Sequence, residues 1–269
     1  MSDWVPRLIA TDMDGTLLRR DESISAATVA ELERWREKGV PLVLATGRPP
    51  RWMHGVRDVL RYGTAVCCNG AVLLDLEPME IIDETPLEPD ALRSITAELR
   101  AHRPTIWFAV EYGFEFRHEP VYRPRWDVDA PGVAAAGLDE MTAVPVAKLL
   151  ARHESMTRDA FVRLVEDVVG ERGTVTNSST DALAEISAPG VTKAHGLAKV
   201  AARHGVGPED VVVFGDMPND IAAFEWVRAG GGRAVAMEHA HPDLLAVATD
   251  VTGGNDEDGV AAFLTSLGS

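Results

Sequence analysis

The 269-residue chain contains few cysteines and no long apolar run. Its two cysteines, Cys67 and Cys68, are adjacent. Neighbouring side chains on a strand point to opposite faces, so no disulfide framework is expected. No stretch approaches the about 20 apolar residues that a membrane-spanning helix needs. Residues 1–6 have neither the basic nor the apolar segment of a secretion signal. These absences predict a cytoplasmic protein that is not anchored in a membrane.

Positive charge is also scarce. The chain has 26 Lys and Arg against 42 Asp and Glu, for a formal net charge of −16. This balance argues against a nucleic-acid backbone or an anionic lipid surface as the main partner. A small anionic substrate fits if a metal ion and a few local cations reverse the field at its site. The expected assembly is a monomer or a weak homo-oligomer.

Both ends of the chain alternate short apolar runs with segments of helical periodicity. Such runs are typical of parallel strands that are covered on both faces. The runs are 8–10, 40–45, 65–68 and 211–214, and the expected helices are 26–39, 50–60, 193–204, 220–227 and 256–267. The pattern predicts an α/β core with a doubly wound parallel sheet, formed by residues 1–82 and 188–269.

The pattern changes between residues 83 and 187. A helix followed by two strand-like runs occurs twice, which predicts an inserted α+β domain. A region rich in Pro, Gly, Arg and Ala, residues 120–137, shows no periodicity and is expected to be a loop. The expected helices are 89–102 and 157–169, and the expected strands are 105–110, 114–118, 174–176 and 182–186.

Polar side chains follow three of the predicted core strands. In an open parallel sheet, ligands bind beyond the carboxyl ends of the strands. Segments far apart in the sequence should therefore bring their polar groups to one edge of the sheet. The residues concerned are Asp12 and Asp14 after the first strand, Thr46 after the second, Asp216 with Asn219 and Asp220 after residue 214, and Lys193 at a helix start.

The carboxylates of this set predict metal and proton chemistry. Asp12 and Asp14, two residues apart, are expected to point the same way along the pleat. Together with Asp216 they crowd negative charge that a hard divalent cation would neutralise, and Mg²⁺ fits better than Ca²⁺ because it needs few protein ligands. One carboxylate can attack phosphorus, and the other can protonate the leaving oxygen and then deprotonate water.

The remaining polar groups suit phosphoryl oxygens. The Thr46 hydroxyl, the Lys193 ammonium group and backbone N–H groups near Met13 and Gly47 could bind them. Asp220 is expected to orient Lys193 rather than to bind metal. Two interpretations of Arg48 stay open, contact with substrate or pairing with an acidic neighbour.

Four of these segments together resemble a known family. Asp-x-Asp-Gly-Thr at 12–16, Thr-Gly-Arg at 46–48, the helix-opening Lys193 and Gly-Asp-x-x-Asn-Asp at 215–220 resemble the four motifs of the haloacid dehalogenase superfamily. The order of the motifs and the insertion between the second and third are similar to those of its type IIB, Cof-like phosphatases. The resemblance covers nearly the whole chain. It implies a Rossmann-like core with a type 2 cap domain, residues 83–187, that selects the substrate.

The resemblance also implies a role for each residue. Asp12 would be the nucleophile that becomes an aspartyl-phosphate, and Asp14 the general acid and base. Mg²⁺ would be bound by the Asp12 carboxylate, the Asp14 carbonyl and the Asp216 carboxylate. The phosphate-binding residues would be Met13, Thr46, Gly47, Lys193 and Asn219.

The implied substrates are small phosphorylated metabolites, such as sugar phosphates, flavin mononucleotide or pyridoxal phosphate. Two alternatives stay open. A phosphomutase or phosphotransferase would use a sugar hydroxyl in place of water as the acceptor. A phospho-acceptor signalling module, which belongs to another class, is much shorter and needs neither a cap nor a second carboxylate.

Overall fold

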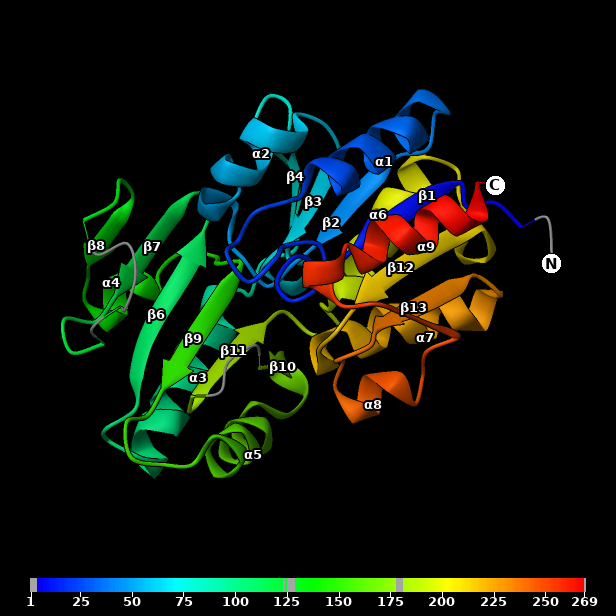
Figure 1. Ribbon diagram of the computed structural model, residues 1–269. Helices are drawn as coiled ribbons and strands as arrows, with labels where there is room; N and C mark the ends of the chain where they lie inside the picture. Colours follow the sequence, from blue (N-terminus) through cyan, green and yellow to red (C-terminus); the bar gives the residue numbers. More distant parts are fainter. Residues whose placement is uncertain (1–3, 123, 125–128, 178–180, 269) are drawn as a thin grey trace. The chain divides into compact units, whose positions relative to one another are not determined.

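The computed structural model describes residues 4–122, 124, 129–177 and 181–268. The chain divides into two compact units, both drawn in Figure 1. The core unit consists of Met1–Arg48, Met53–Ile82 and Thr192–Ser269. The inserted unit consists of Pro49–Trp52 and Asp83–Val191. It therefore ends at Val191 rather than at residue 187, and it includes a short segment from the first part of the chain.

The core unit is built on an eight-stranded sheet of order β14-β13-β12-β1-β2-β3-β4-β5. The strands from β14 to β3 run parallel, and β4 runs antiparallel to β3. Its strands are β1 (Leu8–Thr11), β2 (Leu42–Ala45), β3 (Thr64–Cys67), β4 (Val72–Asp75), β5 (Glu80–Glu84), β12 (Val211–Gly215), β13 (Arg233–Met237) and β14 (Asp250–Thr252). Every residue of β1, β2 and β12 is buried, which explains why these strands are apolar apart from Thr11 at the end of β1.

Helices cover both faces of this sheet (Figure 1). Val213 of β12 packs with α6 (Lys193–Arg203) and α7 (Ile221–Gly230). The next residue, Phe214, points to the other face and meets Phe263 of α9 (Gly259–Leu267), which lies beside α1 (Ala26–Glu37). The core unit also contains α2 (His54–Leu60), α8 (Pro242–Leu245) and the 3₁₀ turns η2 (Cys68–Gly70), η4 (Pro208–Asp210), η5 (Pro218–Asp220) and η6 (Asn255–Glu257). These layers confirm the predicted doubly wound α/β core.

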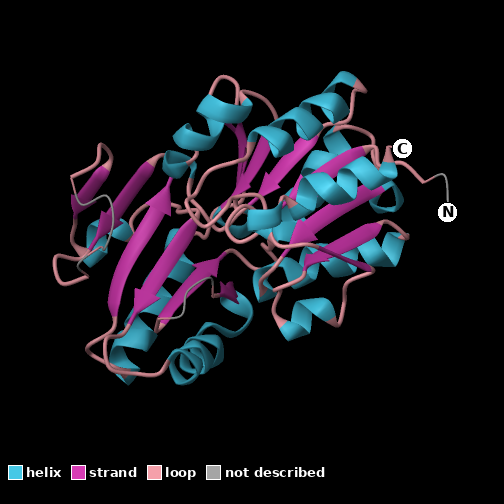
Figure 2. Ribbon diagram, in the orientation of Figure 1, coloured by secondary structure: helices cyan, strands magenta, loops and turns pink. Residues whose placement is uncertain are grey.

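The inserted unit has a six-stranded sheet of order β10-β11-β9-β6-β7-β8, antiparallel except for β7 and β8 (Figure 2). Phe108 and Val110, on one face of β6, pack in a single apolar cluster with Leu99 of α3 and Phe161 of α5. The unit contains β6 (Trp107–Tyr112), β7 (Glu115–His118), β8 (Val133–Ala135), β9 (Lys148–Arg152), β10 (Thr174–Thr176), β11 (Leu183–Ser187), α3 (Pro89–His102), α4 (Leu138–Met141), α5 (Arg158–Val169), η1 (Pro50–Trp52) and η3 (Gly170–Arg172). Its α+β character agrees with the sequence. Within the described residues, each helix is too short or too polar to span a bilayer.

Two strands of this sheet differ from the sequence analysis. The expected loop over residues 120–137 contains β8, which pairs with β7, while residues 123 and 125–128 lie outside the described part of the chain. The strand β9 was not predicted at all, although it pairs with both β6 and β11. Its sequence is Lys-Leu-Leu-Ala-Arg, in which three apolar residues between two basic ones give no alternation.

Candidate active site

The polar residues predicted from the sequence follow neighbouring core strands. β1 lies between β2 and β12, and Thr11, its last residue, is in register with Leu44 and Phe214. This register places Asp12, Thr46 and Asp216 at the same edge of the sheet, just beyond the strand ends. Two parallel ladders therefore bring the three segments together.

Lys193 joins two of these segments. It is the first residue of α6, after the N-cap residue Thr192, and only 1% of its surface is exposed. Its Nζ donates to Asp12 Oδ1 at 2.8 Å and to Asp220 Oδ1 at 2.6 Å. The other Asp220 oxygen accepts from the backbone N–H groups of Asp216 and Met217, at 3.2 and 3.1 Å. Asp220 thus contacts both the lysine and the turn that carries Asp216.

Three buried carboxylates lie close together here, and the Lys193 ammonium group contacts two of them. Each of Asp12, Asp216 and Asp220 offers an oxygen that lies within 4.8 Å of the others. Burial, opposed by Lys193, raises the pKa of Asp12 well above its usual range, and Asp220 and Asp216 add to this increase. Burial likewise raises the pKa of Asp216. The excess of negative charge and the all-oxygen donor set fit a hard divalent cation.

Asp14 lies apart from this cluster. Its side chain is 56% exposed, and Arg48 donates to both of its oxygens, from Nε at 2.8 Å and from Nη2 at 2.5 Å. Asp12 and Asp14 were expected to point the same way along a pleat, but β1 ends at Thr11 and the chain turns immediately afterwards. Asp12 is buried against Lys193, whereas Asp14 is exposed beside Arg48. In this structure Arg48 pairs with an acidic neighbour.

Asn69 is a site residue that the sequence analysis did not select. It lies in the left-handed region, with φ of 54°, in the turn after β3. Its backbone N–H donates to the Thr46 carbonyl at 3.0 Å, and its Oδ1 accepts from Asn219 Nδ2 at 3.1 Å. A Cβ on Gly47 would lie 3.3 Å from the same oxygen. The Asn-Gly pair after an apolar strand was the available signal, but it is also typical of an ordinary turn.

Met13 and His239 complete the surroundings of the first motif. The Met13 side chain is fully buried, so a ligand could meet only its backbone. His239 lies just beyond β13, and its Nε2 is 2.9 Å from the Gly15 carbonyl oxygen. Because a carbonyl only accepts, Nε2 carries the proton. No role for His239 could be predicted from the sequence, since a histidine in a polar loop has no distinctive spacing.

Comparisons with known proteins agree with this arrangement. The sequence profile of the haloacid dehalogenase-like hydrolases matches residues 9–264. The chain is 28% identical to pyridoxal phosphate phosphatase YbhA of Escherichia coli, over 97% of this chain and 98% of that protein. It is 26% identical to the Bacillus subtilis 5-amino-6-(5-phospho-D-ribitylamino)uracil phosphatase YitU, over 96% of both.

A solved sugar phosphatase of haloacid dehalogenase subclass IIB shares the fold. Its TM-score is 0.78 at 21% identity, with 97% of this chain and 98% of that chain covered. The expectation of a Cof-like architecture is thereby confirmed. Because the profile match spans both units, the chain belongs to the haloacid dehalogenase-like hydrolase family.

Proposed function

We propose that the protein is a Mg²⁺-dependent phosphatase that hydrolyses small phosphorylated metabolites through an aspartyl-phosphate on Asp12. One observation carries the proposal. The buried Asp12 carboxylate is held at one oxygen by Lys193, and the Asp216 carboxylate lies beside it. A nucleophile at a strand end with a fixed cation and a second acid beside it suits attack on a phosphoryl group.

Asp12 and Asp14 have separate roles in the proposed reaction. An Asp12 oxygen attacks phosphorus while the bond to the leaving oxygen breaks, and Asp14 gives that oxygen a proton. Water then attacks the phosphoenzyme, Asp14 takes its proton, and phosphate leaves Asp12. Because Arg48 donates to both Asp14 oxygens, this ion pair must open before Asp14 can transfer a proton.

Mg²⁺ would be held by the Asp12 and Asp216 carboxylates and the Asp14 main-chain carbonyl. When bound, it supplies positive charge that neutralises the phosphoryl oxygens. Asp220 is a poorer ligand because one of its oxygens accepts from Lys193 and the other from two backbone N–H groups. Its proposed role is to orient Lys193.

The phosphoryl oxygens would be bound by donors around the strand ends. Lys193 offers its ammonium group and Thr46 its hydroxyl, whose oxygen accepts from the Arg48 backbone N–H at 3.0 Å. Asn219 is held by Asn69, which fixes the direction of its amide. The proposed set is Met13 and Gly47 through their backbone, with Thr46, Lys193 and Asn219, and with Arg48 once it has left Asp14.

The substrate class rests on the relatives. Pyridoxal phosphate and the ribitylaminouracil phosphate are both small phosphate monoesters. We infer that this chain acts on the same class, and that the inserted unit selects the leaving group. An acceptor hydroxyl in place of water would make the protein a phosphomutase or phosphotransferase, and release of inorganic phosphate distinguishes the two.

Replacement of Asp12 by Asn tests the mechanism. With a panel of sugar and cofactor phosphates, Asp12→Asn should lower phosphate release by about 1,000-fold or more, because the nucleophile is lost. With a substrate whose leaving group needs no protonation, Asp14→Asn should instead accumulate a phosphoenzyme, because only the attack by water then needs Asp14; one phosphoryl group adds about 80 daltons to the mass. Undiminished hydrolysis by Asp12→Asn would exclude the proposal. A wild-type phosphoenzyme that lasts for hours with Mg²⁺ would favour a phospho-acceptor module.

A further inference from the structure

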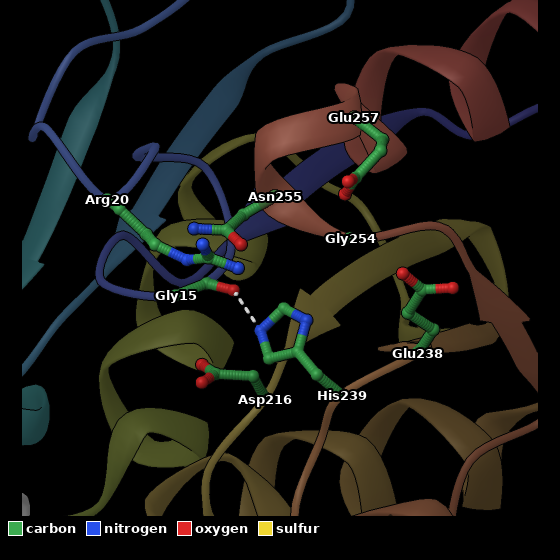
Figure 3. Close-up of a pocket in the computed structure, with 8 residues that line it drawn as sticks. All are labelled: Gly15, Arg20, Asp216, Glu238, His239, Gly254, Asn255 and Glu257. Atoms are coloured by element: carbon green, nitrogen blue, oxygen red, sulfur yellow. Dashed lines mark hydrogen bonds between the residues drawn. The ribbon is translucent and has the colours of Figure 1, made fainter.

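A cavity of about 380 Å³ lies in the core unit beside Asp216 (Figure 3). Its walls come from the first motif, from the loop after β12, from the segment after β13 and from the turn η6. The lining residues are Gly15, Arg20, Asp216, Glu238, His239, Gly254, Asn255 and Glu257. In the close-up, the His239 ring extends across this space to the Gly15 carbonyl.

Gly15 packs directly against the Asp216 carboxylate. A Cβ on Gly15 would lie 2.4 Å from Asp216 Oδ2, and the φ of +77° at Gly15 is one that few other residues adopt. The next residue, Thr16, is buried, and its hydroxyl donates to Asp216 Oδ1 at 3.1 Å. The position of the Gly15–Thr16 peptide thus determines the contacts between the first motif and the Asp216 carboxylate.

Residues 239–241 form hydrogen bonds to both partners of this contact, Gly15 and Asp216. His239 donates to the Gly15 carbonyl, and the His241 backbone N–H donates to the Asp216 carbonyl at 2.8 Å. The His239 side chain is exposed, so it adds little to the apolar core. Its imidazole reaches the site through the hydrogen bond to Gly15, and its positive charge when protonated opposes the rise in the pKa of Asp216.

We propose that His239 is a positioning residue for the cation site. Its hydrogen bond fixes the Gly15 carbonyl, which keeps Thr16 bonded to one Asp216 oxygen and leaves the other directed to the cation. The inference rests on the proposed function, because it concerns the carboxylates assigned to Mg²⁺. Groups that hold metal ligands in place commonly change metal affinity when they are replaced.

Two substitutions of similar size separate the hydrogen bond from the bulk of the ring. His239→Gln keeps an N–H donor at about the same reach, whereas His239→Leu removes the donor. Mg²⁺ binding to the purified full chain is measured by titration calorimetry, and hydrolysis is measured against Mg²⁺ concentration. His204→Leu serves as the control, because His204 follows the last residue of α6, about 16 Å along the helix from Lys193.

His239→Leu should bind Mg²⁺ about tenfold more weakly, and His239→Gln should recover most of that affinity. High Mg²⁺ should restore the hydrolysis rate of His239→Leu, which would not happen if the variant were simply misfolded. Equal Mg²⁺ affinity in His239→Leu and wild type would overturn the inference, as would the absence of Mg²⁺ binding to wild type. The calorimetry needs no substrate, so failure of the phosphatase assignment would be seen separately, as undiminished hydrolysis by Asp12→Asn.

Discussion

Lys193 shows how one residue joins stability and chemistry. A cation at a helix N-terminus is opposed by the helix dipole, and burial further disfavours its charge. Burial alone would lower the pKa of Lys193, but Asp12 and Asp220 outweigh that effect and raise it above its usual range. The ammonium group is therefore charged at every pH at which the protein would work, and it depends on the two carboxylates that it contacts.

Replacement of Lys193 by Met should abolish activity and lower the free energy of unfolding by about 3–5 kcal/mol, because two buried carboxylates lose their partner. Adding Asp220→Asn should recover part of that loss, since one of the two unpaired charges is removed. Urea unfolding without Mg²⁺ measures both effects. Arg203→Met, at the exposed end of the same helix, should cost little, and an equal loss in that control would contradict the role assigned to Lys193.

The sequence could predict most of the candidate site at this scale. Asp12, Thr46 and Asp216 follow apolar strands, and parallel strands bring their ends together whatever the details of packing. The direction of Asp14 could not be predicted, because it depends on a turn that begins directly after Thr11. His239 was missed for a similar reason, since its role depends on a neighbour more than 200 residues away in the chain.

At the scale of elements, α6 approaches β3 and η2 through a glycine. A Cβ on Gly196 would lie 2.3 Å from Val66 Cγ1 and 3.1 Å from the Gly70 Cα. Val66 is fully buried in β3, so it has little room to move. This close packing positions the helix whose first residue is Lys193.

Two glycine-to-alanine substitutions should therefore change stability in opposite directions. Gly196→Ala should lower the free energy of unfolding by about 1–3 kcal/mol through overpacking. Gly55→Ala, in α2, should raise it by about 0.5–1 kcal/mol, because its Cβ would meet open space and alanine favours a helix. Unfolding in urea measures both, and a stabilised Gly196→Ala would show that the packing at Val66 relaxes freely.

Two of the strands that the sequence failed to predict, β9 and β13, share a physical reason. β9 and β13 are five residues each, and their sequences, Lys-Leu-Leu-Ala-Arg and Arg-Ala-Val-Ala-Met, do not alternate and contain one β-branched residue between them, so their local preference for a strand is weak. Pairing on both sides holds them in the sheets, β9 between β6 and β11 and β13 between β12 and β14. Such tertiary support is absent from any local sequence pattern.

At the scale of the whole molecule, one short segment belongs to a different unit from the residues on either side of it. Pro49–Trp52 comes immediately after Arg48, yet it belongs to the inserted unit. Arg51 pairs with the buried Glu111 of β6, and its guanidinium lies 4.9 Å from the centre of the Phe116 ring. Arg51 thus holds the residues that follow the Thr46–Arg48 turn against the inserted sheet.

This ion pair predicts how the stability of the inserted unit depends on pH. Burial raises the pKa of Glu111 from 4.5 to about 7, although Arg51 and Lys148 oppose the change. Between pH 4.5 and about 7, Glu111 has lost its proton in the unfolded chain but keeps it in the folded unit. The contribution of Glu111 to stability is therefore fully present below pH 4.5 and is lost as pH rises through about 7.

From pH 5 to pH 8, wild type should consequently lose stability relative to Glu111→Gln, by on the order of 3 kcal/mol at most. Glutamine has no proton to release, so the difference between the two proteins isolates this one group. Hydrogen exchange of the β6 and β9 amides, corrected for intrinsic rates, measures opening of the inserted unit by itself. Glu140 is an exposed residue of the same unit, and Glu140→Gln should show the same change in stability from pH 5 to pH 8 as wild type. If wild type and Glu111→Gln kept the same stability difference at pH 5 and pH 8, Glu111 would have to be ionised throughout, with Arg51 outweighing the effect of burial.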